Sequence, residues 1–167
     1  MRLLVVRHGI AVEREEWAPR GASDDLRPLT RDGARKMRTG ARALLRLVPE
    51  LELIATSPLL RARQTAEIVQ AAGDDLPLEE TPSLRPEAAP ASFGRWLRVH
   101  RELETVAAVG HEPQLGLLVS WFLAGGERSF IELRKGGACL VEFEALPGAG
   151  RGRLAWLASA GMLRRLR

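Results

Sequence analysis

Short apolar runs alternate along the chain with longer stretches in which apolar residues recur every three or four positions. A short apolar run bounded by turn signals indicates a strand, whereas the three-to-four spacing indicates one face of a helix. The runs predict strands at residues 2–6, 51–56, 76–80, 105–109, 130–133, 139–146 and 154–158. The spacing predicts helices at residues 30–48, 57–73, 91–103 and 113–124.

The alternation of strands and helices predicts a three-layer α/β/α domain with a mostly parallel central sheet and helices on both faces. The chain of 167 residues is long enough for one real core, so we expect a single domain over residues 1–167. Residues 10–29 show neither pattern and form a long loop, a feature that is often functional. We interpret Asp24 and Asp25 within it as turn residues.

The ends of the predicted helices carry residues that begin or end helices. Thr30 is expected to cap the helix at 30–48. Ser57 is expected to cap the next helix, with Pro58 at its first position, where the missing N–H has no effect. The pair Gly125-Gly126 is expected to end the helix that starts at Pro113.

The helix predicted at residues 30–48 has a strongly basic outer face. Its basic residues are Arg31, Arg35, Lys36, Arg38, Arg42 and Arg46. We interpret this face as solvated; the alternative is a docking surface for an acidic protein partner.

Composition excludes several classes of protein. The net charge is +4 and the pI is about 10.4, but the arginines are spread along the chain and no nucleic-acid-binding motif is present, so no nucleic-acid partner is expected. No apolar run reaches the ~18 residues of a membrane span. The first strand follows without a charged-then-apolar stretch before it, so no secretory signal is expected. We expect a cytoplasmic protein without a membrane partner, a monomer or a weak dimer.

Polar residues follow three of the predicted strands. Arg7-His8-Gly9 follows the first strand, Ser57 leads into a helix that carries Arg61 in its first turn, and His111 follows the strand at 105–109. Open α/β sheets bind ligands at the carboxyl ends of their strands. Helix N-termini and arginines at such an edge suit a phosphate group.

His8 is the candidate nucleophile. A neutral imidazole can attack phosphorus and form a phosphohistidine, which divides one transfer into two easier steps. Arg7, Arg61 and His111 are the candidates that stabilise charge on the transferring group. The chain has no Gly-x-x-x-x-Gly-Lys loop and no spacing of metal ligands, so neither a metal nor a cofactor is expected.

These residues resemble the histidine phosphatase superfamily, which includes the cofactor-dependent phosphoglycerate mutases. The resemblance is carried by Arg7-His8-Gly9, by the stretch 57–66 and by Gly110-His111-Glu112-Pro113. It implies a phosphoglycerate mutase-like fold in which His8 is phosphorylated and Arg7, Arg61 and His111 form the phosphate pocket. Gly9 is a further candidate for substrate binding.

The branch of the superfamily can also be predicted. Mutase-like members resemble Arg-His-Gly-x-Ser-x-x-Asn, whereas this chain has Ala11 and Arg14 at the last two named positions. Arg14 is therefore a candidate substrate contact, with a loop arginine of no such role as the alternative. The stretches 27–30 and 154–157 resemble the small bacterial phosphohistidine phosphatases of the SixA type.

The proton donor bears on the substrate. Hydrolysis of an alkyl phosphate expels an alkoxide, so a positioned acid should help. Glu87 is the first candidate, and the others are Glu79, Glu80 and Glu112. Phosphohistidine has a better leaving group, and its hydrolysis depends less on a strong acid. Because the sequence does not clearly identify one carboxylate as the proton donor, phosphohistidine is favoured as the substrate.

We therefore predict a phosphatase acting on phosphohistidine in a protein, for example a histidine-phosphotransfer domain. The alternative within enzymes is hydrolysis of a small phosphate ester, with mutase activity ranked below it. The alternative of another class is an inactive phosphate-binding adaptor, which the intact set Arg7, His8, Arg61 and His111 disfavours.

Overall fold

The computed structural model describes residues 1–73, 76–126 and 128–166. Its strands are β1 (Arg2–Arg7), β2 (Leu53–Thr56), β3 (Leu78–Glu80), β4 (Thr105–Gly110), β5 (Ala138–Phe143) and β6 (Gly152–Ala158). Its α-helices are α1 (Arg14–Trp17), α2 (Arg31–Leu47), α3 (Leu60–Gln70), α4 (Pro90–Val99), α5 (Gln114–Ala124) and α6 (Ala160–Leu163). Short 3₁₀ helices cover Ala18–Arg20, Asp24–Leu26 and Pro82–Leu84.

The strands form one sheet in the order β3-β2-β4-β1-β5-β6. The neighbours β3, β2, β4 and β1 pair in parallel, and β5 pairs antiparallel with both β1 and β6. The mostly parallel sheet is thus as predicted. Because Arg7 at the end of β1 stands opposite Gly110 at the end of β4, the residues that follow these strands emerge side by side.

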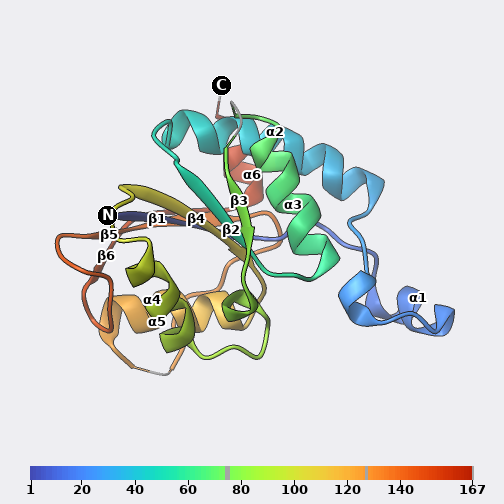
Figure 1. The fold of residues 1–167 in the computed structure, drawn as a ribbon. Helices are drawn as coiled ribbons and strands as arrows, with labels where there is room; N and C mark the ends of the chain where they lie inside the picture. The colour runs from blue at the N-terminus through green and yellow to red at the C-terminus, as the bar shows by residue number, and fades with distance from the viewer. Residues whose placement is uncertain (74–75, 127, 167) are drawn as a thin grey trace.

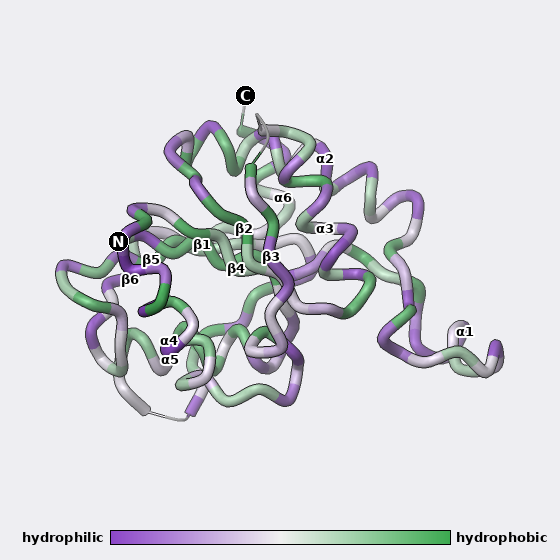
Figure 2. Tube along the Cα trace, viewed as in Figure 1, coloured by the Kyte–Doolittle hydropathy of each residue, from purple (hydrophilic) through white to green (hydrophobic). Residues whose placement is uncertain are grey.

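Helices cover both faces of the sheet (Figure 1). On one face, α2 and α3 pack over a core that includes Leu4, Val6 and Ile54. On the other face, α4 and α5 pack over a core that includes Leu3 and Val5. Alternate residues of β1 therefore face opposite layers, which explains why the strand is apolar from Leu3 to Val6. Figure 2 shows the central strands as largely hydrophobic and α2 as largely hydrophilic on its outer side.

Two of the three predicted helix signals are confirmed. The Thr30 side chain accepts a hydrogen bond from the Gly33 amide at 2.9 Å, and Gly125 ends α5 with a φ of 76°. The prediction for Ser57 and Pro58 is wrong, because α3 begins at Leu60 with Leu59 as its N-cap residue. The hydroxyl of Ser57 lies instead 2.9 Å from the ring of His111, so the two residues form a connection outside the helix.

The strand predicted at residues 130–133 is absent. Its backbone binds side chains rather than a neighbouring strand: the Phe130 amide donates to Ser120 Oγ, and the Leu133 amide donates to Glu112 Oε1. The helix predicted to reach residue 103 ends at Val99, so His100 lies just beyond the helix and not within it. Its ring packs on Trp96, with 4.0 Å between the ring centroids.

Residues 10–29 are folded back on themselves although they connect β1 to α2. An isolated bridge pairs Ala11 with Leu29, which closes the two ends of the segment. The buried Arg27 also donates from NH1 to the Val12 carbonyl at 2.7 Å. The 3₁₀ helix Asp24–Leu26 directly precedes Arg27, inside the segment that both contacts close, so its position is fixed relative to the sheet edge.

Among the described residues, none forms a helix long and apolar enough to cross a membrane.

Candidate active site

The ends of β1 and β4 and the start of α3 bring four side chains together. Arg7 is the last residue of β1, and His8 follows it. His111 follows β4, and its ring centroid lies 5.0 Å from that of His8. Arg61, the second residue of α3, is buried and close enough to influence both histidines electrostatically. The structure thus gathers at one edge of the sheet residues that are far apart in the sequence.

The ring of His8 is held in one tautomer. Its Nδ1 lies 2.7 Å from the Gly9 carbonyl oxygen, which can only accept, so Nδ1 carries the proton and Nε2 has a free lone pair. Burial lowers the pKa of His8 to about 3, and the charges of Arg61 and Arg7 act in the same direction. At neutral pH the imidazole is therefore neutral, which is the state required of a nucleophile.

His111 is held by Ser57. Its Nε2 lies 2.9 Å from Ser57 Oγ, and its Nδ1 is buried without a hydrogen-bond partner among the described residues. Burial lowers the pKa of His111 to about 2, helped by His8 and Arg61. Two neutral imidazoles thus face one another beside the buried guanidinium of Arg61.

The two arginines are tied to main-chain carbonyls. Arg7 NH1 donates to the Leu133 carbonyl at 2.7 Å, and Arg61 NH1 donates to the Asp24 carbonyl at 2.9 Å. Within the described part of the chain, Nε of each arginine is buried and has no partner. A buried polar group without a partner costs roughly 1–3 kcal/mol. These two N–H groups are donors suited to the oxygens of a bound oxyanion.

Gly9 has a structural role. Its amide donates to Thr65 Oγ1 at 3.0 Å, and the Thr65 hydroxyl donates to the Arg61 carbonyl at 2.7 Å. Its carbonyl accepts from His8. Because both backbone groups are engaged, Gly9 offers no free donor to a substrate and instead connects His8 to the first turn of α3. Thr65 and Ser57 are therefore parts of the site, although the sequence indicated only a capping role for Ser57.

Asp24 begins a one-turn 3₁₀ helix, in agreement with its interpretation as a turn residue, but its side chain has a further role that the sequence did not indicate. Its Oδ2 lies 3.2 Å from Arg61 NH2, and its Oδ1 accepts from Arg27 Nε at 2.8 Å. Partial burial alone would raise the pKa of Asp24, but the bond from Arg27 and the charge of Arg61 hold it below its ordinary value. The loop therefore brings an ionised carboxylate onto the guanidinium of Arg61. The spacing of Asp24 and Arg27, three residues apart, was the available sequence signal.

The sequence of residues 3–96 matches the model of the histidine phosphatase superfamily (branch 1). The chain belongs to this superfamily. Together with the SixA relatives below, this match shows that the protein is a phosphatase with the phosphoglycerate mutase-like fold.

Relatives point to the SixA-type branch of the superfamily. Phosphohistidine phosphatase SixA of Escherichia coli (strain K12) is 33% identical over 131 residues, which cover 75% of this chain and 76% of that protein. An uncharacterized protein of Picosynechococcus sp. is 36% identical over 139 residues, 82% of either chain. The solved structure of the protein histidine phosphatase SixA complexed with tungstate has a TM-score of 0.81 and 28% identity, covering 96% of this chain and 98% of that one.

Arg14 and Glu87 are exposed, whereas His8, Arg61 and His111 of this histidine phosphatase are buried at the sheet edge. The side chain of Arg14 is 70% exposed, and its Nε lies 3.5 Å from Asp24 Oδ1. Glu87 is 69% exposed and bound to Arg85 Nε at 2.8 Å. The bond from Arg85 lowers the pKa of Glu87, so at neutral pH this carboxylate has no proton to donate.

The other three candidates for the proton donor, Glu79, Glu80 and Glu112, also contact neighbouring groups. Glu79 lies 3.3 Å from the His100 ring, and Glu80 lies 2.9 Å from Arg63. Burial raises the pKa of Glu112, whose carboxylate accepts from the Leu133 and Gly116 amides. Glu112 thereby fixes the segment whose carbonyl anchors Arg7. Across the described residues, no three His, Cys, Asp or Glu side chains form a group that could hold a metal ion.

Proposed function

We propose that the protein hydrolyses phosphohistidine in a protein substrate through a phosphohistidine intermediate on His8. The observation that carries the proposal is the neutral, tautomerically fixed ring of His8, whose Nδ1 donates to the Gly9 carbonyl and whose Nε2 keeps its lone pair. Buried Nε–H groups of Arg7 and Arg61 and the ring of His111 provide the donors that a phosphoryl group requires.

In the first step, Nε2 of His8 attacks the phosphorus atom. The P–N bond of the substrate breaks, and its electron pair goes to the leaving imidazole, which departs neutral when its other ring nitrogen carries a proton. The hydrogen bond to the Gly9 carbonyl stabilises the positive charge that develops on the His8 ring. Arg7, Arg61 and His111 stabilise the equatorial oxygens of the transferring group.

In the second step, water attacks the phosphorus atom of phosphorylated His8. The P–N bond breaks, the electron pair returns to Nε2, and inorganic phosphate leaves with the oxygen of the attacking water. No step requires a metal or a cofactor, because the fixed guanidinium groups provide the positive charge.

The choice of phosphohistidine rests on the carboxylates. An alkoxide leaving group needs a proton donor, and Glu87, the first candidate, is ionised by its bond to Arg85. An imidazole leaving group has no such requirement. The name of the Escherichia coli relative, phosphohistidine phosphatase SixA, supports the same substrate class, and the tungstate in the solved SixA structure supports a site for a tetrahedral oxyanion.

The decisive experiment compares kcat/KM for a phosphorylated histidine-phosphotransfer domain with that for a panel of sugar and nucleotide phosphates. We expect the phosphoprotein to exceed every small ester, and the activity to survive chelators. His8→Ala should abolish turnover, whereas His100→Ala, a histidine outside the site, should retain it.

Two results would overturn the proposal. A clear preference for one small ester would make the protein a phosphomonoesterase of the same superfamily. Tight binding of inorganic phosphate without turnover of any phosphorylated compound would make it an adaptor.

A further inference from the structure

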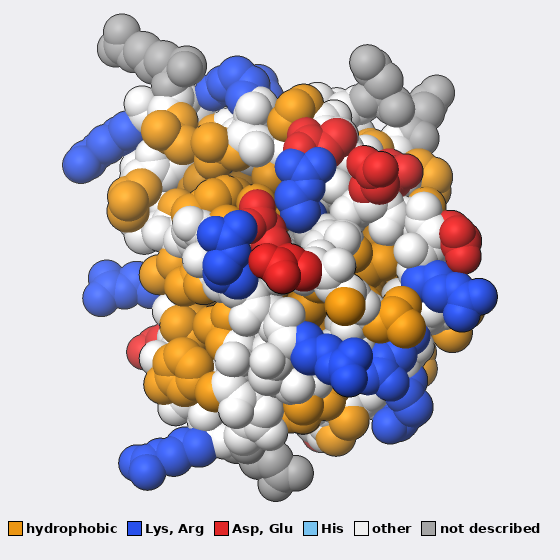
Figure 3. Space-filling view, turned by 90° about the vertical axis from the view of Figure 1, so that its left-hand side faces the viewer, with side chains coloured by type: hydrophobic (Ala, Val, Ile, Leu, Met, Phe, Trp, Pro, Cys, Tyr) orange, Lys and Arg blue, Asp and Glu red, His pale blue; other side chains and the backbone are white. Residues whose placement is uncertain are grey.

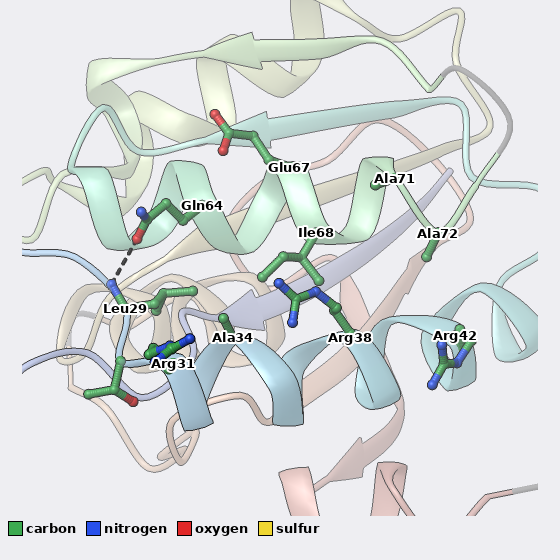
Figure 4. A pocket seen from close by; sticks show the side chains of 11 residues that line it. Leu29, Arg31, Ala34, Arg38, Arg42, Gln64, Glu67, Ile68, Ala71 and Ala72 are labelled. Atoms are coloured by element: carbon green, nitrogen blue, oxygen red, sulfur yellow. Dashed lines mark hydrogen bonds between the residues drawn. The ribbon is translucent and has the colours of Figure 1, made fainter.

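A groove of about 860 Å³ runs between α2 and α3 on the outer side of their layer (Figure 4). Residues from both helices and from the preceding loop line it, namely Leu29, Thr30, Arg31, Ala34, Arg38, Arg42, Gln64, Glu67, Ile68, Ala71 and Ala72. Its floor is apolar and its α2 side carries three arginines. The basic face that the sequence indicated as merely solvated therefore borders a hollow with an apolar floor.

The arginines of the groove differ from the other basic residues of α2. Arg35 and Lys36 pair with Asp32. By contrast, neither Arg31 nor Arg38 forms a salt bridge with any residue that the structure describes. Glu67 lies across the groove but pairs with Arg63 at 3.7 Å, and Figure 4 shows it pointing to the side of α3 away from α2. Arg31 and Arg38 of the groove thus differ from Arg35 and Lys36, whose charges are balanced by the carboxylate of Asp32.

Another surface of the molecule provides a contrast. Figure 3 shows the face on the left-hand side of Figure 1, where basic and acidic side chains are interspersed. On the neighbouring strands β5 and β6, Arg153 pairs with Glu142 at 2.5 Å. The α2 side of the groove differs from this pair of strands, because its lining residues include three arginines and no acidic residue.

The spacing of the three arginines suits a helical partner. Arg31, Arg38 and Arg42 lie seven and four residues apart, so they share one face of α2 and extend over roughly 16 Å at a rise of 1.5 Å per residue. A second helix lying along α2 would repeat the same spacing with acidic residues, while its apolar face covered Ala34 and Ile68.

The groove also reaches the active-site edge of the sheet. At that end the Gln64 side chain accepts from the Leu29 amide at 2.7 Å, and the side chain of Leu29 packs against Gly9. Thr65, next to Gln64, accepts from the Gly9 amide. A helix bound in the groove would consequently end near Gly9, the residue that follows His8.

We propose that this groove binds an acidic amphipathic helix of the phosphorylated protein substrate. The proposal rests on the proposed function for the identity of the substrate. It assigns to α2 the recognition of the protein, and to the pocket around His8 the recognition of the phosphoryl group.

The test uses the double variant Arg31→Glu/Arg38→Glu and a control of equal charge on the same helix, Arg35→Glu/Arg46→Glu. The substrates are a phosphorylated histidine-phosphotransfer domain with an acidic helix and p-nitrophenyl phosphate. We expect the groove variant to lose about tenfold or more in kcat/KM for the phosphoprotein, mainly through KM, because about 1.4 kcal/mol of binding corresponds to tenfold. Hydrolysis of p-nitrophenyl phosphate should stay unchanged, and the control should keep both activities.

An equal loss of phosphoprotein activity in groove variant and control would overturn the proposal, because net charge alone would then explain it. If the groove variant also loses activity on p-nitrophenyl phosphate, Arg31→Gln/Arg38→Gln replaces it in the same assay, and unchanged KM for the phosphoprotein would overturn the proposal. A wild-type dimer that the groove variant converts to a monomer in sedimentation would also overturn it, because a second copy of the chain would then occupy the groove.

A binding measurement separates this proposal from the proposed function. His8→Ala protein is titrated with the unphosphorylated phosphotransfer domain, with and without the groove substitutions. Binding that the substitutions abolish supports the groove even if the wild-type protein prefers a small ester, whereas binding that they leave unchanged overturns it.

Discussion

The pocket around His8 and the groove between α2 and α3 both present arginines, but the two regions hold them differently. The Arg61 side chain is 4% exposed, and its guanidinium is bound by the carbonyl and the carboxylate of Asp24. Arg38 is exposed. Electrostatic interactions are strong in a buried, low-dielectric site, where the charged side chains also keep fixed positions. Interactions of exposed charges are screened by salt, and exposed side chains can change their conformation. Buried arginines thus suit one arrangement of phosphoryl oxygens, and exposed ones suit attraction to a surface.

The largest expected difference comes from replacing arginine by lysine in each region. Arg61→Lys keeps the charge but removes the planar fork and the buried Nε–H, so we expect kcat/KM for p-nitrophenyl phosphate to fall about 100-fold. Arg38→Lys should change the kcat/KM for a phosphoprotein by less than about twofold, since an exposed lysine attracts an acidic surface nearly as well. Similar losses in the two variants would contradict the comparison.

The pocket should also make stability depend on pH. Burial holds His8 and His111 neutral, with pKa values of about 3 and about 2, whereas the unfolded chain binds these protons near pH 6.5. The folded state then holds fewer protons below pH 6.5, so the free energy of unfolding should fall as pH drops, by at most about 1.4 kcal/mol per pH unit for each histidine. Urea unfolding between about pH 7 and about pH 5 measures this slope.

A variant tests which group is responsible: His8→Asn should reduce the slope. If His8→Asn left the slope unchanged, His8 would not be the group whose protonation opposes folding.

A smaller effect is expected from the carboxylate that joins the loop to the pocket. Asp24→Asn removes the charge that holds Arg61 NH2 but keeps the backbone carbonyl that holds NH1. We expect kcat for p-nitrophenyl phosphate to fall about tenfold, the loss of one charge-assisted contact to a buried arginine. Asp25→Asn is the matched control: Asp25 pairs with the partly exposed Arg85, and breaking such a pair should change kcat by less than about twofold. Equal effects would show that the carbonyl alone positions Arg61.

The smallest expected effect is that of salt on the groove. Raising the salt concentration from about 0.05 M to about 0.5 M shortens the distance over which exposed charges act. The kcat/KM for an acidic phosphoprotein should decrease about threefold to fivefold, while that for p-nitrophenyl phosphate should change much less. Identical salt dependence for both substrates would argue against steering by the groove.

Much of this molecule follows from local sequence. The apolar runs located β1, β2 and β4, and the spacing of apolar residues located α2, because each element buries a face whose period is visible in the chain. Thr30 was identified as a cap because its side chain bonds an amide only three residues away. Where the decisive contacts were distant, sequence reasoning failed: residues 130–133 bind Ser120 and Glu112 rather than a strand, and Ser57 binds His111 rather than a helix N-terminus.

The same division applies to the site. The residue types at positions 7, 8, 61 and 111 and their order along the chain are properties of the sequence alone, and they suffice to indicate a phosphate pocket at the sheet edge. Only the tertiary structure decided that Asp24 turns onto Arg61, that Gly9 binds Thr65, and that the arginines of α2 border a groove. These arrangements depend on where a loop and two helices pack relative to a strand end, and no local pattern in the chain specifies such long-range contacts.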